Sequence, residues 1–334
     1  MKQVLKERAK APQVLRRLYA PVHDELDRVE QLLRKELRSD YPFVDRLVKH
    51  GFRLGGKRLR PALVLLCGKA SGTLAAEHLK LATAVEMIHT ATLIHDDVLD
   101  EATLRRHLDT VNARWDNEAS VLLGDYLFAR SIRMASALDD PAASRAISAV
   151  AQTMCEGELR QVAGRGNYDL AEADYLEIIS GKTAVLTGCC CRLGSHYAGA
   201  EPELSESLAR FGHDLGIAFQ IADDLLDLLG EEATAGKSLG TDLLKQKATL
   251  PLIRLLSQAS RQDRTEIIDL LSRSGNHRRD ALRPWLERSD AIPYARQVAL
   301  VYSQQAAEQL DALAASPVRD SLVGLARFVV DRQQ

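Results

Sequence analysis

The segment ATLIHDDVLD, residues 91–100, sets three aspartates into a run of mostly apolar residues. A second segment, IAFQIADDLLDLL at residues 217–229, repeats the Asp-Asp-x-x-Asp pattern in equally apolar surroundings. Both stretches are long and free of Pro and Gly breaks, which is typical of buried helices. Residues four apart share a helix face, so we expect Asp96 and Asp100 to project together, as do Asp223 and Asp227.

Carboxylates at this spacing repel one another, and apolar surroundings raise the cost further. A run of charges usually lies on a solvated helix face, whereas these aspartates interrupt apolar sequence. Hard divalent cations offset the repulsion, and Mg²⁺ binds through a few carboxylates together with substrate phosphates. Two such clusters could face each other across a bundle core and bind several Mg²⁺ ions around one polyphosphate. The expected metal ligands are Asp96, Asp97, Asp100, Asp223, Asp224 and Asp227.

The composition favours helices throughout the chain. Its 334 residues include 52 Leu and 44 Ala but only 10 Pro and 20 Gly, and Leu and Ala are strong helix formers. We therefore expect an all-α protein, a single large helical bundle over residues 1–334 with a central active-site cavity. The expected helices span residues 13–38, 61–70, 77–101, 117–138, 142–162, 172–198, 203–229, 248–258, 263–273, 278–288, 292–313 and 317–332.

Charge and cysteine content exclude several classes of protein. A net charge of −2 gives no support for nucleic-acid binding, which requires a large basic excess. The five Cys residues show no CxxC spacing and are expected to be reduced thiols of a cytoplasmic protein. The charged start, MKQVLKERAK, does not resemble a signal peptide, and no apolar stretch approaches 18 residues.

Basic residues near the first cluster predict phosphate binding. The segment GGKRLRP, residues 55–61, places three cations on a Gly-rich turn at an expected helix start, where backbone N–H groups favour an anion. Arg105 and Arg106 follow the first aspartate cluster. Alone, the turn would be a solvated basic loop; beside two acidic clusters it predicts a second anion pocket, since Arg binds diphosphate oxygens bidentately.

Six motifs in this order resemble those of the trans-type isoprenyl diphosphate synthases, or polyprenyl synthetases, over about residues 15–330. They are GGKRLRP (55–61), EMIHTATLIHDDVLDEATLRR (86–106), LLGDYLFAR (122–130), GKTAVL (181–186), FQIADDLLDLLG (219–230) and GKSLGTDLLKQKATLP (236–251). The resemblance implies the all-α isoprenoid synthase fold, a homodimer, three Mg²⁺ ions per site, and condensation of an allylic diphosphate with isopentenyl diphosphate. Contact with a membrane would be peripheral at most, for release of a long product.

The resemblance also implies residue roles. Isopentenyl diphosphate would be bound by Lys57, Arg60, His89 and Arg106. The allylic diphosphate would be bound by Arg105, Lys182, Thr183, Gln220, Lys237 and Lys247. The catalytic group would comprise Asp96, Asp97, Asp100, Lys182, Thr183, Gln220 and Asp223.

The chain departs from the family pattern at three points. His107 stands where members usually have Gly after the paired arginines, Asp116 follows Trp115 where Gly is usual, and Gln246 replaces the usual Gly before Lys247. All three positions are expected in loops, outside the ligand set.

Product length is expected to depend on the residues just before the first cluster. Short-chain members place a bulky aromatic four or five residues before the first Asp, whereas Ala91 and Thr92 are small. Four residues span about 6 Å of helix, so a wall here would stop the growing tail early. A medium- or long-chain polyprenyl diphosphate synthase is therefore expected, with a shorter-chain farnesyl or geranylgeranyl diphosphate synthase as the alternative.

Three other functions compete with this interpretation. A metal phosphohydrolase is suggested by the His95-Asp96 pair, but it needs separate His ligands and leaves the second cluster unexplained. A terpene cyclase or head-to-head prenyl synthase shares the acidic motifs without needing the GGKRLRP pocket. A catalytically silent subunit of a heteromeric synthase would have lost aspartates or cations that this chain retains.

Overall fold

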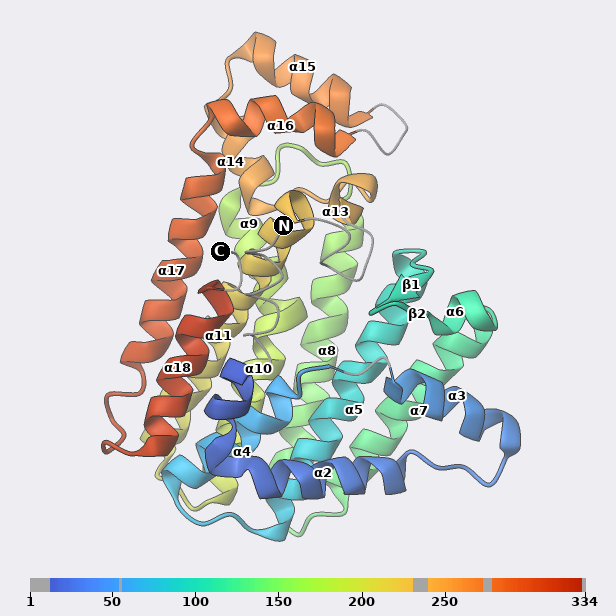
Figure 1. Cartoon of the computed structure of the whole chain (residues 1–334), viewed down its shortest axis with the longest axis vertical. Coiled ribbons are helices and arrows are strands. Elements are labelled where there is room, and N and C mark those ends of the chain that lie inside the picture. Colours follow the sequence, from blue (N-terminus) through green and yellow to red (C-terminus); the bar gives the residue numbers. More distant parts are fainter. Residues whose placement is uncertain (1–12, 54–55, 231–239, 273–277, 332–334) are drawn as a thin grey trace.

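A computed structural model describes residues 13–53, 56–230, 240–272 and 278–331, and these are almost entirely helical (Figure 1). The all-α prediction is confirmed. Residues 13–18 are helical, and the later elements are η1 (Ala20–Val22), α2 (His23–Glu36), α3 (Pro42–Arg53), α4 (Leu59–Ser71), α5 (Ala76–Leu99), β1 (Leu104–Arg105), β2 (Leu108–Asp109), α6 (Val111–Arg114), α7 (Asn117–Ser136), α8 (Ala142–Ala163), α9 (Glu172–Ile179), η2 (Ser180–Ala184), α10 (Val185–Tyr197), α11 (Pro202–Leu229), α13 (Thr241–Leu244), α14 (Leu250–Gln258), α15 (Arg261–Ser272), α16 (Arg278–Arg288), α17 (Ala291–Glu308) and α18 (Pro317–Asp331).

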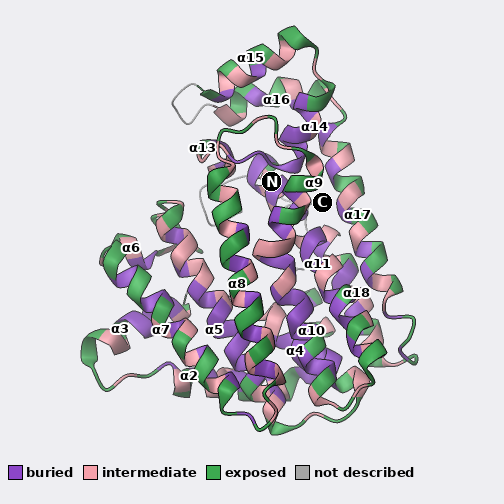
Figure 2. Ribbon diagram, turned by 180° about the vertical axis from the view of Figure 1, so that it is seen from behind, coloured by how far each residue is buried: buried purple, intermediate pink, exposed green. Residues whose placement is uncertain are grey.

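The two helices that carry the repeated motif form the centre of the bundle. Helix α5 has 24 residues and α11 has 28, the longest among the described elements. Helix α5 packs against α4 and α7, α11 packs against α10 and α17, and α10 contacts α4, α5 and α11. Both motif helices are largely buried (Figure 2). Each fully buried Leu, Ile or Phe stabilises the fold by roughly 1.5–3 kcal/mol, so their apolar faces fix where the motifs lie.

Apolar packing continues from this centre into the smaller helices α14, α15 and α16. Tyr302 and Val330 pack against both the main core and a second cluster of buried residues around α11, α14 and α17. Ile292 in turn contacts the second cluster and a third one beneath α15 and α16. The chain's core is therefore continuous, although the assignment of one domain over residues 1–334 stays a prediction.

The structure corrects the expected helices at their N-terminal end. The helix expected over 13–38 is interrupted by the 3₁₀ turn Ala20–Val22, which contains Pro21. Proline lacks the N–H that would continue the α-helical hydrogen bonds. Helix α3 was not predicted, because Pro42 was interpreted as a break. Instead, Pro42 is its first residue, a position where the missing N–H costs nothing.

The helix expected over 172–198 contains a π-helical segment, Ser180–Ala184. This segment lies against α8 at a glycine contact: a Cβ on Gly157 would be 2.6 Å from the backbone nitrogen of Lys182. Such π segments inside helices are rare and concentrate at functional sites. The wider turn here carries Lys182 and Thr183.

The hairpin β1–β2 was also not predicted, because two residues per strand are too few to show alternation. Leu104 pairs with Asp109 and Arg105 with Leu108 in an antiparallel register. The short helices α6 and α13 were missed for the same reason of length. The hairpin follows α5 directly, so it places Arg105 and Arg106 beside the first aspartate cluster.

Two of the three departures from the family pattern, His107 and Gln246, lie at left-handed backbone positions. His107 has φ of 63° and Gln246 has φ of 55°, both in the left-handed region that glycine favours. Asp116 has an extended backbone, and its Oδ1 accepts a hydrogen bond from the Ala119 N–H at 2.7 Å, so it caps α7. His107 and Gln246 thus carry some backbone strain.

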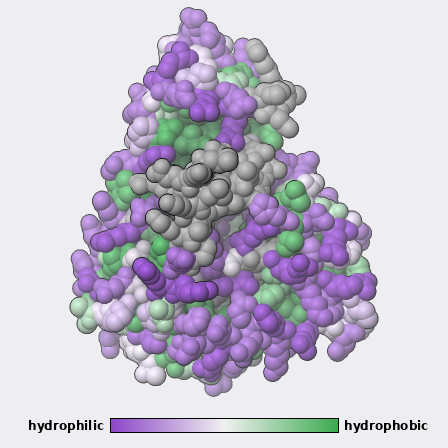
Figure 3. All heavy atoms as spheres, in the orientation of Figure 1, coloured by the Kyte–Doolittle hydropathy of each residue, from purple (hydrophilic) through white to green (hydrophobic). Residues whose placement is uncertain are grey.

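The face shown in Figure 3 is mostly hydrophilic, with apolar side chains in small separate groups. Within the described residues, no helix combines the length and the hydropathy that a membrane span requires.

Replacing His107 by Gly is expected to stabilise the protein. The side chain is exposed, so its loss removes little packing, while a left-handed non-glycine residue costs about 1 kcal/mol. The control is His107→Ala, which removes the imidazole but keeps the Cβ and its strain. Chemical denaturation should give the Gly variant a free energy of unfolding about 1 kcal/mol above that of the Ala variant. Equal values would show that the turn is not strained.

Candidate active site

The first aspartate cluster lies at the C-terminal end of α5. Asp96 and Asp100 have side chains that are 25% and 23% exposed, so they remain accessible to solvent. Asp100 ends the helix, and its N–H donates to the Asp96 carbonyl at 2.8 Å. The expected shared face of Asp96 and Asp100 is therefore present at a helix end.

Asp97 differs from its two neighbours because its side chain is only 2% exposed. Arg105 of the hairpin donates from Nε to both carboxylate oxygens, at 2.9 and 3.1 Å, and its Nη2 lies 2.8 Å from Oδ1. Burial raises the pKa of Asp97, and the bond to Arg105 opposes this. A metal ion would compete with Arg105 for these oxygens, so the role of Asp97 as a metal ligand stays a prediction.

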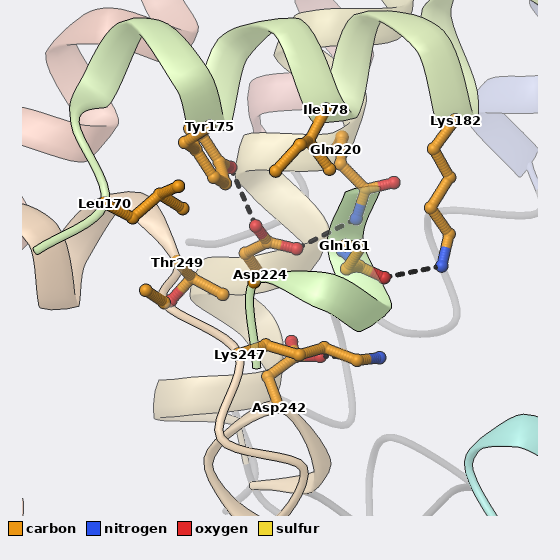
Figure 4. A pocket seen from close by; sticks show the side chains of 12 residues that line it. Gln161, Leu170, Tyr175, Ile178, Lys182, Gln220, Asp224, Asp242, Lys247 and Thr249 are labelled. Carbon is orange, nitrogen blue, oxygen red and sulfur yellow. Dashed lines mark hydrogen bonds and ion pairs between the residues drawn. The ribbon is translucent and has the colours of Figure 1, made fainter. Parts of the chain in front are cut away.

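In the second cluster, Asp224 is buried and joined to a chain of hydrogen bonds (Figure 4). The Tyr175 hydroxyl donates to Oδ2 at 2.7 Å, and Gln220 Nε2 donates to Oδ1 at 2.8 Å. Thr183 Oγ1 donates to Gln220 Oε1 at 2.8 Å. Burial, together with the nearby charge of Asp242, raises the pKa of Asp224 to about 8. This series of hydrogen bonds joins η2 and α9 to the motif on α11.

Carboxylates of both clusters act on the charge of Arg105. Burial opposes the charge on Arg105, yet Asp97, Asp96 and Asp223 together raise its pKa. Asp223 belongs to the second cluster and the other two to the first. A single guanidinium thus lies within reach of both motifs.

Lys247 links the clusters at a second point. Its Nζ lies 3.1 Å from Asp100 Oδ1 and 3.5 Å from Asp242 Oδ1. The Asp242 N–H donates to Asp227 Oδ2 at 3.1 Å, so α13 connects Lys247 to the second motif. Burial opposes the charge on Lys247, and Asp242 and Asp100 raise its pKa overall. Lys247 is therefore held as a cation between the two acidic clusters.

Lys182 is the third cation near the acidic clusters, after Arg105 and Lys247. Its Nζ lies 2.5 Å from Glu158 Oε2, donates to Gln161 Oε1 at 2.9 Å, and lies 3.9 Å from Asp96 Oδ1. Burial works against its charge, but Asp96 and Glu158 raise its pKa well above the usual range. The π segment and two side chains of α8 thus aim this ammonium at the first cluster.

The predicted second anion pocket corresponds to the surroundings of His89, where Arg60 and Arg106 act on the imidazole. His89 on α5 is surrounded by arginines, and burial together with Arg60, Arg106, Arg105 and Arg58 lowers its pKa well below the usual value. His89 is therefore a neutral imidazole at pH 7. Arg60 has a buried Nε with no hydrogen-bond partner, and burial lowers its pKa. This pocket thus holds an unsatisfied donor, as expected where an anion binds.

Gly56 brings the Gly-rich turn and the paired arginines together. A Cβ at Gly56 would collide with Arg106 Nη2, so a side chain at this position would displace the guanidinium. Lys57 is exposed on the same turn, with its Nζ 5.8 Å from the centre of the Phe328 ring. The Gly-rich turn and Arg106 therefore lie together, while binding of one diphosphate by Lys57, Arg60, His89 and Arg106 stays a prediction.

The remaining predicted residues are placed as follows. Lys237 lies outside the described residues. Ala91 is fully buried, and Thr92 is half-buried with its hydroxyl donating to the His89 carbonyl at 2.9 Å. His95, one turn further on, stacks on Phe128 of α7 with ring centres 6.3 Å apart. Ala91 and Thr92 thus precede the cluster by one turn, as required for a tail-length role.

Several residues of the site carry no signal in the sequence. Glu158 and Gln161 hold Lys182, Tyr175 donates to Asp224, and Asp242 bridges Lys247 to the second motif. They lie on other helices, and single polar residues on an amphipathic helix look like ordinary surface positions. Only the packing of α8, α9 and α13 around the motif helices reveals them.

The carboxylates fit Mg²⁺ in chemistry, although they are not preassembled as a cage. In the described part of the chain, no three His, Cys, Asp or Glu side chains are close enough to hold an ion alone. Asp96 and Asp100 are accessible oxygen donors, and cations now neutralise the clusters. Mg²⁺ prefers a few carboxylates plus substrate phosphates to an all-protein cage, which matches this arrangement.

Comparison with known proteins agrees with the geometry. Residues 41–286 match the family model "Polyprenyl synthetase". The chain is 36% identical to an all-trans-nonaprenyl-diphosphate synthase of Rhodobacter capsulatus over 95% of this chain and 98% of that one. It is 34% identical to heptaprenyl diphosphate synthase component 2 of Bacillus subtilis, over 94% and 90% of the two chains.

A solved structure extends the likeness to three dimensions. The polyprenyl synthase of Caulobacter crescentus, complexed with calcium and isoprenyl diphosphate, superposes with a TM-score of 0.91 at 33% identity, over 96% of this chain and 98% of that one. The motifs, the acidic clusters and these similarities lead to one conclusion. This chain belongs to the polyprenyl synthetase family.

Proposed function

We propose that the protein condenses an allylic diphosphate with isopentenyl diphosphate, head to tail, and repeats this step to build a medium- or long-chain all-trans polyprenyl diphosphate. One observation carries the proposal. Arg105 and Arg106 are adjacent, yet Arg105 faces the acidic clusters and Arg106 faces the Gly56 turn. Two diphosphate pockets therefore adjoin, which would bring two substrates together in one orientation.

The allylic diphosphate would bind between the acidic clusters. Asp96, Asp100 and Asp223, with Asp97, Asp224 and Asp227, would hold Mg²⁺, and three ions per site remain the expectation. Bound Mg²⁺ would supply charge neutralisation for the departing diphosphate. The chain's own contribution would come from Lys182, Arg105 and Lys247, whose ammonium and guanidinium groups point at the same space. These groups would stabilise the negative charge that grows as the C–O bond breaks.

The second pocket would orient isopentenyl diphosphate. Lys57, Arg60 and Arg106 supply the positive charge, and neutral His89 supplies a hydrogen bond. The double bond would attack the allylic carbon, and loss of a proton to the released diphosphate would restore neutrality. The oxygens of Thr183 and Gln220 lie beside Lys182 and would offset the positive charge on the allyl group.

Assembly as a homodimer is part of this proposal. Helix α7 exposes Val121, Leu122 and Ile132, with 42%, 61% and 40% of their surfaces accessible. Three large apolar side chains on one exposed helix suit a contact with a second copy. Release of a long product would involve at most a peripheral contact with a membrane.

The decisive experiment uses the purified chain alone, because a similar protein is named as one component of its synthase. The chain would be incubated with labelled isopentenyl diphosphate, geranyl, farnesyl or geranylgeranyl diphosphate, and Mg²⁺. Labelled polyprenyl products should form, stop forming with a chelator, and return with excess Mg²⁺. Products that incorporate no isopentenyl units would favour a terpene cyclase, and release of phosphate alone would favour a hydrolase.

Removing a carboxylate from either cluster should abolish most of the activity. Asp96→Ala and Asp223→Ala are each expected to lower kcat by at least about 100-fold. Each variant removes a carboxylate that would hold Mg²⁺, and the Mg²⁺ would stabilise the charge of the departing diphosphate. Steady-state kinetics measures this. Asp174→Ala, which changes an exposed carboxylate on α9, is the control and should retain full activity. Undiminished turnover in both cluster variants would contradict the proposed role of the motifs.

A bulky residue at position 91 should shorten the product. Ala91→Phe places a ring one turn below Asp96, where it would block the growing tail. Chromatography of the dephosphorylated products should show a shift to shorter chains, while Ala91→Ser, which stays small, keeps the wild-type distribution. Identical distributions for the Phe and Ser variants would rule out a tail path beside this residue.

A further inference from the structure

The Gly-rich turn contains three cations, and the structure gives one of them a different environment from the others. Arg58 is held by two carboxylates: its Nε pairs with Glu30 of α2, and its Nη1 lies 2.7 Å from Glu86 Oε1 of α5. Its guanidinium also lies over the Phe52 ring of α3, 4.9 Å from the centre. The side chain is 16% exposed. Arg58 therefore joins the turn to three separate helices.

The charge of Arg58 is already matched inside the protein. Burial opposes its charge, but Glu86 and Glu30 raise its pKa overall. By contrast, Arg60, two residues further along the chain, has a buried Nε without a hydrogen-bond partner. The two arginines thus divide into one that is bound by protein carboxylates and one that is available to an anion.

The backbone at Arg58 explains why this anchor matters. Arg58 has φ of 53° and ψ of 34°, a left-handed conformation that non-glycine residues adopt only when the surroundings impose it. It is the residue before α4, and its carbonyl accepts the Ala62 N–H at 3.0 Å. The Tyr19 hydroxyl fixes the preceding carbonyl, that of Lys57, at 3.0 Å. The side-chain contacts of Arg58 thus hold a strained turn in place.

We propose that Arg58, tethered by Glu30 and Glu86, is a positioning residue for the second diphosphate pocket. It does not contact the diphosphate; it fixes the turn on which Gly56 receives the Arg106 guanidinium and from which Lys57 and Arg60 extend. This inference rests on the proposed function, because it assigns isopentenyl diphosphate to that pocket. Without the tether, Lys57, Arg60 and Arg106 are still present, but their side chains occupy a wider range of positions. Binding of the diphosphate must then order them, which costs affinity.

The principal variant is Arg58→Met, which keeps the apolar length over Phe52 and removes the paired guanidinium. Binding of isopentenyl diphosphate by calorimetry should weaken about tenfold, and its KM should rise similarly. The KM for the allylic diphosphate should stay within twofold. Arg53→Met, which removes an exposed cation of α3, is the matched control for loss of positive charge and should leave both values unchanged.

A second variant separates positioning from charge. Glu30→Gln removes a negative charge near the pocket, so an effect of charge alone would tighten isopentenyl diphosphate binding. Positioning predicts the opposite, a threefold or larger weakening, because the ion pair that tethers Arg58 Nε becomes a weaker hydrogen bond to a neutral amide. Circular dichroism and allylic-diphosphate binding would show that both variants are folded.

The outcomes separate the inference from the proposed function. Wild-type protein that binds isopentenyl diphosphate, with Glu30→Gln binding it equally well or better, overturns the positioning role and leaves the function intact. Equal weakening for both substrates in Arg58→Met would show a general structural role and also overturns the inference. Wild-type protein that does not bind isopentenyl diphosphate overturns the proposed function, and the inference with it.

Discussion

The site depends on the pairing of acidic side chains in buried helices with cations supplied by other elements. Carboxylates within an apolar bundle are costly unless they are paired. Asp96 faces Lys182, Asp97 is bonded to Arg105, and Asp100 is bonded to Lys247. These cations come from η2, from the hairpin just after α5 and from the segment after α13, so the pairing joins one adjacent and two distant parts of the sequence to the end of α5.

The same pairing gives the two pockets different characters. Around the motifs, cations and carboxylates are mixed, so a bound metal and an anion can share the charges already present. Around His89, four arginines act on one imidazole and the histidine is neutral. The first environment suits a diphosphate that leaves with its metal ions, and the second suits a diphosphate that is only held. This difference matches one substrate that ionises and one that does not.

Local irregularities in the fold occur mainly where the site requires them. The π segment widens the helix at Lys182, and glycine at position 157 allows α8 to approach it. Left-handed residues at Arg58, His107 and Gln246 lie in the loops that border the pockets. The bundle therefore tolerates strain in the loops whose geometry positions the ligands.

The sequence by itself determined the helical class, most helix boundaries and the family, because these follow from local periodicity and ordered motifs. It misjudged Pro42, which can begin a helix as well as end one, and it could not show a two-residue hairpin. Only the tertiary structure decided that Arg58 forms ion pairs with Glu30 and Glu86. It also decided that Asp97 pairs with Arg105. Likewise, it showed that Glu158 and Gln161 hold the Lys182 ammonium near the first cluster. Apart from Asp97 and Arg105, which are 8 residues apart, these partners are distant in the chain, and their pairing depends on how the elements pack.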